Sequence, residues 1–196
     1  MFIILFFAAA FFVFLNFSCI NYFKEADSKF RSSIIQTLIF ISAFIFISTE
    51  LLSLFNAVNS SGIIITWSVL LLLSSILNWI RWDKHFPHMN LSVGVPTDRN
   101  AKIINNTLNK FLFYSTCFIL IITLTTALVA SPNNWDSMTY HLSRVMHWIQ
   151  NENVNFYPTQ IDRQLTQPPF AEYFILHLQL LNGSDRFANI VQWCFF

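Results

Sequence analysis

Charged residues are scarce in this sequence. Asp, Glu, Lys and Arg together make up 11% of its 196 residues, whereas soluble domains carry about 25%. Hydrophobic residues make up 55%, among them 23 Phe, and the mean hydropathy is +0.52. This composition excludes an ordinary soluble domain and predicts an integral membrane protein surrounded by a lipid bilayer.

The sequence also lacks a basic patch and any paired cysteine spacing. Its net charge is only +1, so nucleic acid is not expected as a partner, because that requires a clustered basic surface. Cys19, Cys117 and Cys194 each lie in an apolar run. They are interpreted as small buried hydrophobic residues, with no expected role in disulfides or metal binding.

No Lys or Arg precedes Lys24, so the first apolar run lacks the basic start of a signal peptide and is expected to remain as a membrane span. Four runs are long enough to cross roughly 30 Å of hydrocarbon at about 1.5 Å per residue. They cover residues 2–20, 33–55, 63–80 and 111–130. The fold class is therefore expected to be all-α, with polytopic transmembrane helices.

The basic residues between the spans predict the orientation. They gather in the loops at 21–32 and 81–110, which the positive-inside rule places in the cytoplasm. The N-terminus, the turn near Asn59 and the loop at 131–168 are then outside. We expect a multi-pass protein of the plasma (inner) membrane.

The loop at 131–168 contains the most informative pattern. At about 100° per residue, polar side chains gather on one arc: Asp136, Tyr140, Ser143, Arg144, His147 and Asn151. Apolar side chains fall opposite: Met138, Leu142, Val145, Met146 and Ile149. The pattern predicts one amphipathic helix from about residue 134 to 151, lying in the interface with its polar arc toward water. Ser131 or an Asn at 133 or 134 would cap its start.

A shorter apolar helix is expected after this loop. Pro168 and Pro169 suit a helix start, and Gly183 suits a helix end. The run 170–182 is short for a full span. Asp185 and Arg186 are expected on the cytoplasmic side, with the last run turning back outward.

The order of these features resembles the membrane glycosyltransferases of the GT-C fold, nearest the protein O-mannosyltransferase and aminoarabinose-transferase-like (glycosyltransferase family 39-like) group. The resemblance covers about residues 111–196. It rests on six features in order. An acid follows a span (Asp136), an aromatic residue comes four positions later (Tyr140), and a Trp lies in the helix (Trp148). A Tyr-Pro (Tyr157-Pro158), a Pro-Pro-apolar helix start (Pro168-Pro169-Phe170) and an Arg that opens the next helix (Arg186) come after them.

The resemblance implies transfer of a sugar from a polyprenyl-phosphate donor to a protein or lipid-linked glycan acceptor on the extracytoplasmic face. It implies Asp136 as the catalytic base. Many relatives have Asp-Glu where this chain has Asp136-Ser137, so the second carboxylate must come from elsewhere or be missing. Glu172 and Asp162 are the candidates for it, and Glu172 is included in the candidate catalytic pair.

The candidate substrate-binding residues are Tyr140, His141, Arg144 and Arg163. A leaving phosphate needs positive charge, and the two guanidinium groups offer bidentate donors, with His141 or His147 assisting. The competing interpretation is that these Arg side chains bind lipid headgroups. The sequence does not decide whether a divalent metal takes part.

The sequence predicts a division near residue 110. Residues 1–110 would hold three spans and cytoplasmic loops, and residues 111–196 the start of a catalytic membrane domain. Because the chain ends within an apolar run, we expect it to be an N-terminal fragment. The alternative function is a non-catalytic membrane protein or an inactive fragment. A transporter is disfavoured, because ionisable residues gather in loops and not within spans.

Overall fold

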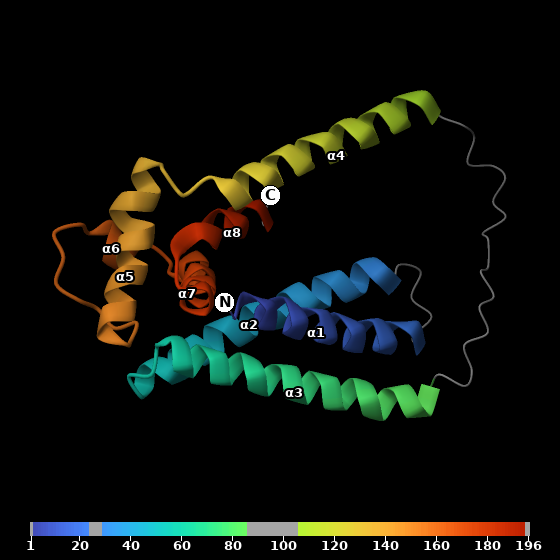
Figure 1. The fold of residues 1–196 in the computed structure, drawn as a ribbon, viewed down its shortest axis with the longest axis horizontal. Helices are drawn as coiled ribbons and strands as arrows, with labels where there is room; N and C mark the ends of the chain where they lie inside the picture. Colours follow the sequence, from blue (N-terminus) through green and yellow to red (C-terminus); the bar gives the residue numbers. More distant parts are fainter. Residues whose placement is uncertain (1, 24–28, 86–105, 195–196) are drawn as a thin grey trace.

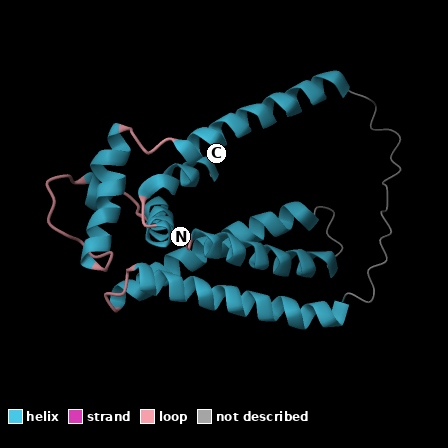
Figure 2. Cartoon of the chain, viewed as in Figure 1, coloured by secondary structure: helices cyan, strands magenta, loops and turns pink. Residues whose placement is uncertain are grey.

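A computed structural model describes residues 2–23, 29–85 and 106–194 of the chain. These residues form helices joined by loops, and no strand occurs among them (Figures 1 and 2). The predicted all-α fold class is confirmed.

The four predicted spans are all helices. They are α1 (Ile3–Phe23), α2 (Lys29–Leu54), α3 (Ser60–His85) and α4 (Asn106–Val129). Each contains a window long and apolar enough to cross a membrane. Polar side chains within them are tied to backbone carbonyls one turn earlier, as Thr37 Oγ1 is to Ser33 O at 2.7 Å, which satisfies them away from water.

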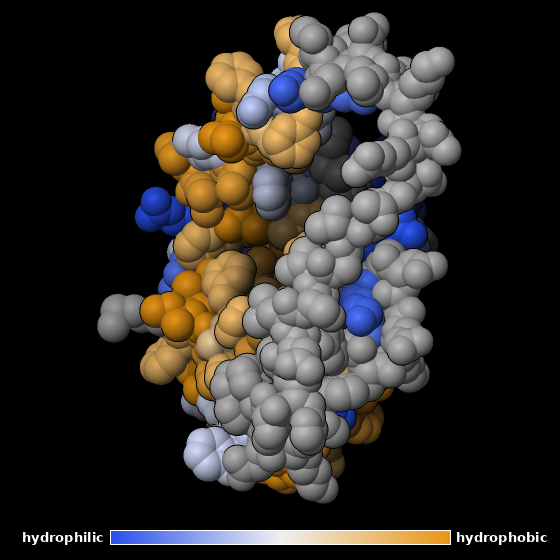
Figure 3. Space-filling view, turned by 90° about the vertical axis from the view of Figure 1, so that its right-hand side faces the viewer, coloured by the Kyte–Doolittle hydropathy of each residue, from blue (hydrophilic) through white to orange (hydrophobic). Residues whose placement is uncertain are grey.

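Much of the surface of these helices is apolar. Large hydrophobic side chains remain exposed on each of them, including Ile4 (73%), Phe30 (70%), Trp79 (75%) and Val129 (74%). Figure 3 shows apolar side chains over much of the described surface at the end where α3 ends and α4 begins. Exposed apolar area on this scale requires lipid or protein around it, so the chain is a membrane protein.

Helix α1 packs against both α2 and α3, and the spans alternate in direction (Figure 1). The start of α1, the α2–α3 turn and the end of α4 therefore lie at one end of the molecule, as the charge pattern predicts. Backbone and side-chain hydrogen bonds tie this end together: Val58 N donates to Glu152 O at 2.9 Å, and Val154 N donates to Ser53 Oγ at 2.9 Å. We call it the α5 end.

Three shorter helices build the α5 end: α5 (Leu142–Asn151), α6 (Arg163–Thr166) and α7 (Phe170–Asn182). Helix α5 lies across the direction of the spans in Figure 1, as expected for an interfacial helix. Helix α7 begins directly after Pro169 and ends at Gly183, whose φ of 79° suits glycine. Both predicted boundaries of α7 are confirmed.

Helix α7 joins the two predicted parts of the chain. It packs on α5 and also on α1, α2 and α3. One buried cluster accordingly includes Ile45 and Trp67 from the spans, Val145 and Trp148 from α5, and Leu176 from α7. The division near residue 110 stays a prediction.

The last helix, α8 (Ala188–Cys194), corrects one expectation. Arg186, in the 3₁₀ turn η3 (Asp185–Phe187), donates to Leu128 O at 3.4 Å, so it lies beside the end of α4. Asn189 Nδ2 then donates to Ala130 O at 2.8 Å, and Trp193 Nε1 to Thr123 Oγ1 at 3.2 Å. Arg186 therefore lies at the same end of the molecule as the loop at 131–168, and the prediction that it lies at the opposite end is wrong. Helix α7 lies across the α5 end, and α8 runs back along α4 toward the other end.

Candidate functional site

A widened helical turn opens the site. The chain is helical from residue 135 to 151, but η2 (Ser137–His141) is a π-helical turn closed by a bond from Leu142 N to Ser137 O. Asn134 Oδ1 accepts from Ser137 N at 2.6 Å, so the predicted Asn cap is confirmed at 134. The prediction of one continuous helix holds in outline, with one residue more in this turn than an α-helix allows.

The polar arc of this helix does not simply face water. The chain's own segment 163–167 and helix α7 cover part of it, so Arg144 is only 1% exposed. The prediction that Arg144 faces water is wrong. On the other arc, Val145 and Trp148 are buried as expected for the apolar face, whereas Met138 and Met146 are exposed.

Both terminal nitrogens of the Arg144 guanidinium are bonded to other parts of the chain. Nη1 donates to Gln167 O at 3.0 Å and to Glu172 Oε1 at 3.2 Å, and Nη2 donates to Arg163 O at 2.7 Å. The Trp148 ring lies 5.7 Å from the guanidinium carbon. With these contacts, Arg144 has no solvent-facing donor for a phosphate and instead fixes the 163–167 segment on α5.

The Glu172 carboxylate contacts two side chains, those of Arg144 and His141. It is 1% exposed on α7, and its Oε1 lies 3.2 Å from Arg144 Nη1 and 2.9 Å from His141 Nδ1. Glu172 therefore does not contact solvent, and it reaches the exterior only through His141. Asp162, the other candidate for a second carboxylate, is exposed at the start of α6.

A buried amide closes the loop over η2. Gln164 Nε2 donates to Thr139 O at 2.8 Å, and Gln164 Oε1 accepts from Tyr157 Oη at 3.1 Å and Thr159 Oγ1 at 2.9 Å. Burial raises the pKa of Tyr157 above its usual value, so the phenol remains a hydrogen-bond donor. Both polar atoms of the Gln164 amide are therefore paired, and these hydrogen bonds fix the loop on η2.

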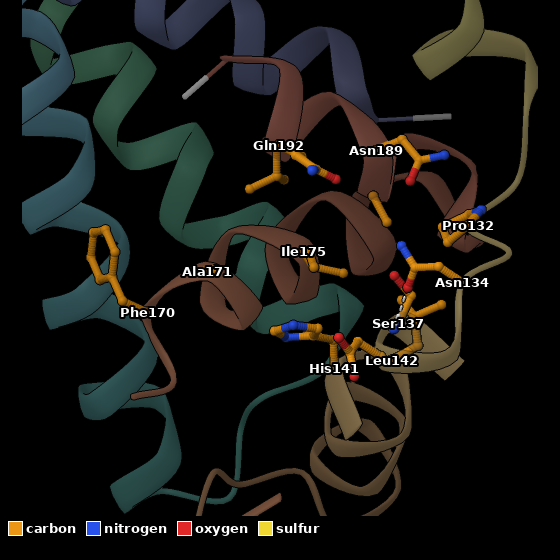
Figure 4. A pocket seen from close by; sticks show the side chains of 13 residues that line it. Pro132, Asn134, Ser137, His141, Leu142, Phe170, Ala171, Ile175, Asn189 and Gln192 are labelled. Atoms are coloured by element: carbon orange, nitrogen blue, oxygen red, sulfur yellow. Dashed lines mark hydrogen bonds between the residues drawn. The ribbon is translucent and has the colours of Figure 1, made fainter. Parts of the chain in front are cut away.

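A cavity of about 570 Å³ lies between η2, α7 and α8. Asp136 and His141 line it together with amide side chains, and Figure 4 shows several of the lining side chains converging on it. The amides are Asn134 before the turn and Asn189 and Gln192 on α8. Sequence reasoning missed the last two, although an Asn and a Gln three residues apart in an apolar run share one helix face.

Asp136 and Arg163 form an exposed pair near the cavity. Their Oδ1 and Nη1 atoms are 3.5 Å apart, and the side chains are 59% and 64% exposed. Both groups remain open to a ligand, because an exposed pair of this kind is weak. The ring of the predicted aromatic residue Tyr140 lies against that of His141, with centroids 3.9 Å apart and the two planes tilted by 39°. His147 stacks instead on Tyr157, and it does not line the cavity.

A second polar cluster, which was not predicted, lies in the core. Trp67 Nε1 donates to His177 Nδ1 at 2.9 Å, so the imidazole proton sits on Nε2 and is donated to Thr49 Oγ1 at 2.8 Å. Thr49 Oγ1 in turn donates a hydrogen bond to Ile45 O at 2.7 Å. All three side chains are fully buried. The cluster fixes α7 on α2 and α3 as a neutral network, and the ionisable His in an apolar helix was its only signal.

Helix α7 makes one more polar contact with the spans. Tyr173 Oη donates to Glu50 Oε1 at 2.5 Å. Glu50 is the one acid in the predicted spans, and it lies near the end of α2. Its interfacial position matches the sequence interpretation, and it is far in the chain from the cavity residues.

In comparisons with known proteins, no family model, no curated protein and no solved structure matches the chain. Within the described residues, no group of three or more His, Cys, Asp or Glu side chains gathers as a metal site.

Proposed function

We propose that this chain is a membrane glycosyltransferase of the GT-C type, which transfers a sugar from a polyprenyl-phosphate donor to a protein or glycan acceptor on the extracytoplasmic face of the plasma membrane. The observation that supports it is the position of Asp136: an exposed carboxylate lining a cavity, seven residues after the end of span α4. The headgroup of a lipid-linked substrate lies at this depth.

Asp136 acts as the base in this mechanism. Its carboxylate takes the proton of the acceptor hydroxyl while the acceptor oxygen bonds to the sugar C1 carbon and the bond from C1 to the phosphate oxygen breaks. A positioned base of this kind contributes about 10²- to 10⁴-fold. Arg163, beside Asp136 at 3.5 Å, supplies positive charge near the departing polyprenyl phosphate.

The cavity offers a sugar substrate both polar partners and apolar surface. Its lining combines a carboxylate, an imidazole and three amide side chains with apolar groups such as Phe170 and Ile175. Amides and carboxylates pair with sugar hydroxyls, and apolar groups pack on sugar ring faces. The residues of α8 that line the cavity bring the end of the described chain into the site.

The test is sugar transfer by the full-length protein in liposomes, with a panel of radiolabelled hexoses on undecaprenyl phosphate as donors. Asp136→Asn keeps the side-chain size but removes the proton acceptor, so transfer should fall by about 10²-fold or more. Asp83→Asn, near the opposite end of α3, is the matched control and should transfer normally.

Near-normal turnover by the Asp136→Asn protein would end the assignment of the base, and Asp162 would be the next exposed acid to test. No transfer by the folded wild-type protein from any donor would favour the alternative, a non-catalytic membrane protein.

A further inference from the structure

His141 stands between a buried carboxylate and the cavity. Its Nδ1 atom is 2.9 Å from Glu172 Oε1, and its side chain is 32% exposed. The ring lines the cavity from η2 (Figure 4). One nitrogen is therefore held by the protein, and the ring remains accessible from the cavity.

The hydrogen bond fixes which nitrogen is free. A carboxylate only accepts hydrogen bonds, so Nδ1 carries the proton in the neutral ring and Nε2 is left for a ligand. Nε2 makes no hydrogen bond to any residue that the structure describes. When Nε2 is also protonated, the imidazolium donates on both sides, and the Glu172 carboxylate stabilises its charge.

Glu172 is itself held in place. Arg144 bonds the same Oε1 atom at 3.2 Å and is anchored by the carbonyl oxygens of Arg163 and Gln167. Glu172 is too deeply buried to touch a ligand. In this arrangement it is a positioning residue, and the catalytic role expected for it from the sequence stays a prediction.

The widened turn brings this imidazole toward Asp136. Residues five apart in an α-helix point about 140° apart, and the π-helical turn closed between Ser137 O and Leu142 N takes an extra residue, which reduces this angle between Asp136 and His141. Asp136 and His141 both line the cavity as a result. The other charged or ionisable groups near the ring are Glu172, Arg144 and Tyr140.

We propose that His141 is the general acid of this site, with Glu172 as its positioning residue; this deepens the proposed function and rests on it. The acceptor proton goes to Asp136, the acceptor oxygen bonds to C1, and the C1–oxygen bond to the phosphate breaks. His141 Nε2–H gives its proton to that departing phosphate oxygen and regains a proton from solvent. Pairs of titratable groups in one site commonly divide the acid and base roles in this way.

The first test separates proton transfer from structure. In His141→Asn the amide nitrogen takes the place of Nδ1 and keeps the bond to Glu172, but nothing replaces Nε2. Transfer from the active undecaprenyl-phosphate donor should then show a kcat about 10²-fold lower, with KM changed much less. A kcat within threefold of wild type would overturn the acid role, because the Asn side chain can replace a histidine whose role is only to bond Glu172.

The second test needs no activity and no variant. Diethyl pyrocarbonate modifies accessible imidazoles, and mass spectrometry of the wild-type protein in liposomes gives the extent at each His. His141 should react and be protected by undecaprenyl phosphate, but not by undecaprenol, which lacks the phosphate. Buried His177 is the internal control for folding and should stay unmodified.

The two tests distinguish the two proposals. If wild-type protein transfers no sugar, the proposed function fails, and protection of His141 by undecaprenyl phosphate alone still supports a phosphate site at Nε2. Equal modification of His141 with and without the phosphate lipid would overturn the placement of the departing phosphate at this imidazole, whatever the activity.

Discussion

Arg144 offers the sharpest test of the packing behind the cavity. Its side chain is 2% exposed and meets a carboxylate that is 1% exposed. Arg144→Met keeps most of the apolar stem but removes the charge and three hydrogen bonds. Removing one partner of a buried pair costs about 3–5 kcal/mol, because the other charge is left uncompensated. We expect the free energy of unfolding to fall by about that amount.

The same reasoning predicts a change of sign at Glu172. In the wild-type protein, Glu172→Gln leaves the Arg144 guanidinium buried without its carboxylate, so it should destabilise by about 3 kcal/mol. In the Arg144→Met background, Glu172→Gln removes an uncompensated buried charge instead. There it should be neutral or stabilising.

The assay is unfolding in mixed micelles with increasing dodecyl sulfate, followed by circular dichroism for the four proteins of the cycle. Arg163→Ala is the matched control: it also removes a cation from this loop, but from an exposed pair, so its cost should be about 0–1 kcal/mol. Equal costs of Glu172→Gln in both backgrounds, within about 0.5 kcal/mol, would refute the coupling. The buried pair would then not be what holds α7 on α5.

Two further predictions concern the glycines and the orientation. A Cβ at Gly62 would lie 2.2 Å from Ala57 O, so Gly62→Ala should displace the α2–α3 turn and lower the free energy of unfolding by about 1–3 kcal/mol. A Cβ at Gly183 would meet open space, but the residue has a φ of 79°, so Gly183→Ala should lower the free energy of unfolding by about 1 kcal/mol. The same unfolding assay measures both. In a cysteine-free background, a cysteine at Asn59 should react with an impermeant reagent added outside the cell, and one at Asp98 should not. Labelling of position 98 from outside would contradict the orientation.

The elements that the sequence predicted well are those determined by local chemistry. Apolar runs of sufficient length became α1 to α4, because in lipid a helix is the structure that satisfies its own backbone. Pro169 and Gly183 set the ends of α7 for equally local reasons, namely a missing amide donor and a positive φ. Asn134 capped its helix in the same way.

The contacts that were not predicted depend on residues far apart in the chain. His177 meets Trp67 and Thr49, which lie 110 and 128 positions away, and no local pattern contains such a pairing. The direction of α8 likewise depends on Asn189 bonding the end of α4, a contact that loop charge does not report. Arg144 was placed on a polar arc correctly, but the sequence did not show that the chain itself would cover that arc.

The η2 turn explains why the cavity could be predicted only in part. A regular helix places Asp136 and Tyr140 on one arc and leaves His141 outside it, so periodicity identified Asp136 and missed the position of the imidazole. The extra residue of the turn leaves some of its carbonyl groups without their usual α-helical donors. A regular helix is therefore favoured unless other donors bond these carbonyl groups. Ser143 Oγ donates to Met138 O at 2.7 Å, and Gln164 Nε2 donates to Thr139 O at 2.8 Å from 25 positions away. The shape of the site thus depends on a loop that closes over the turn from a distant part of the sequence.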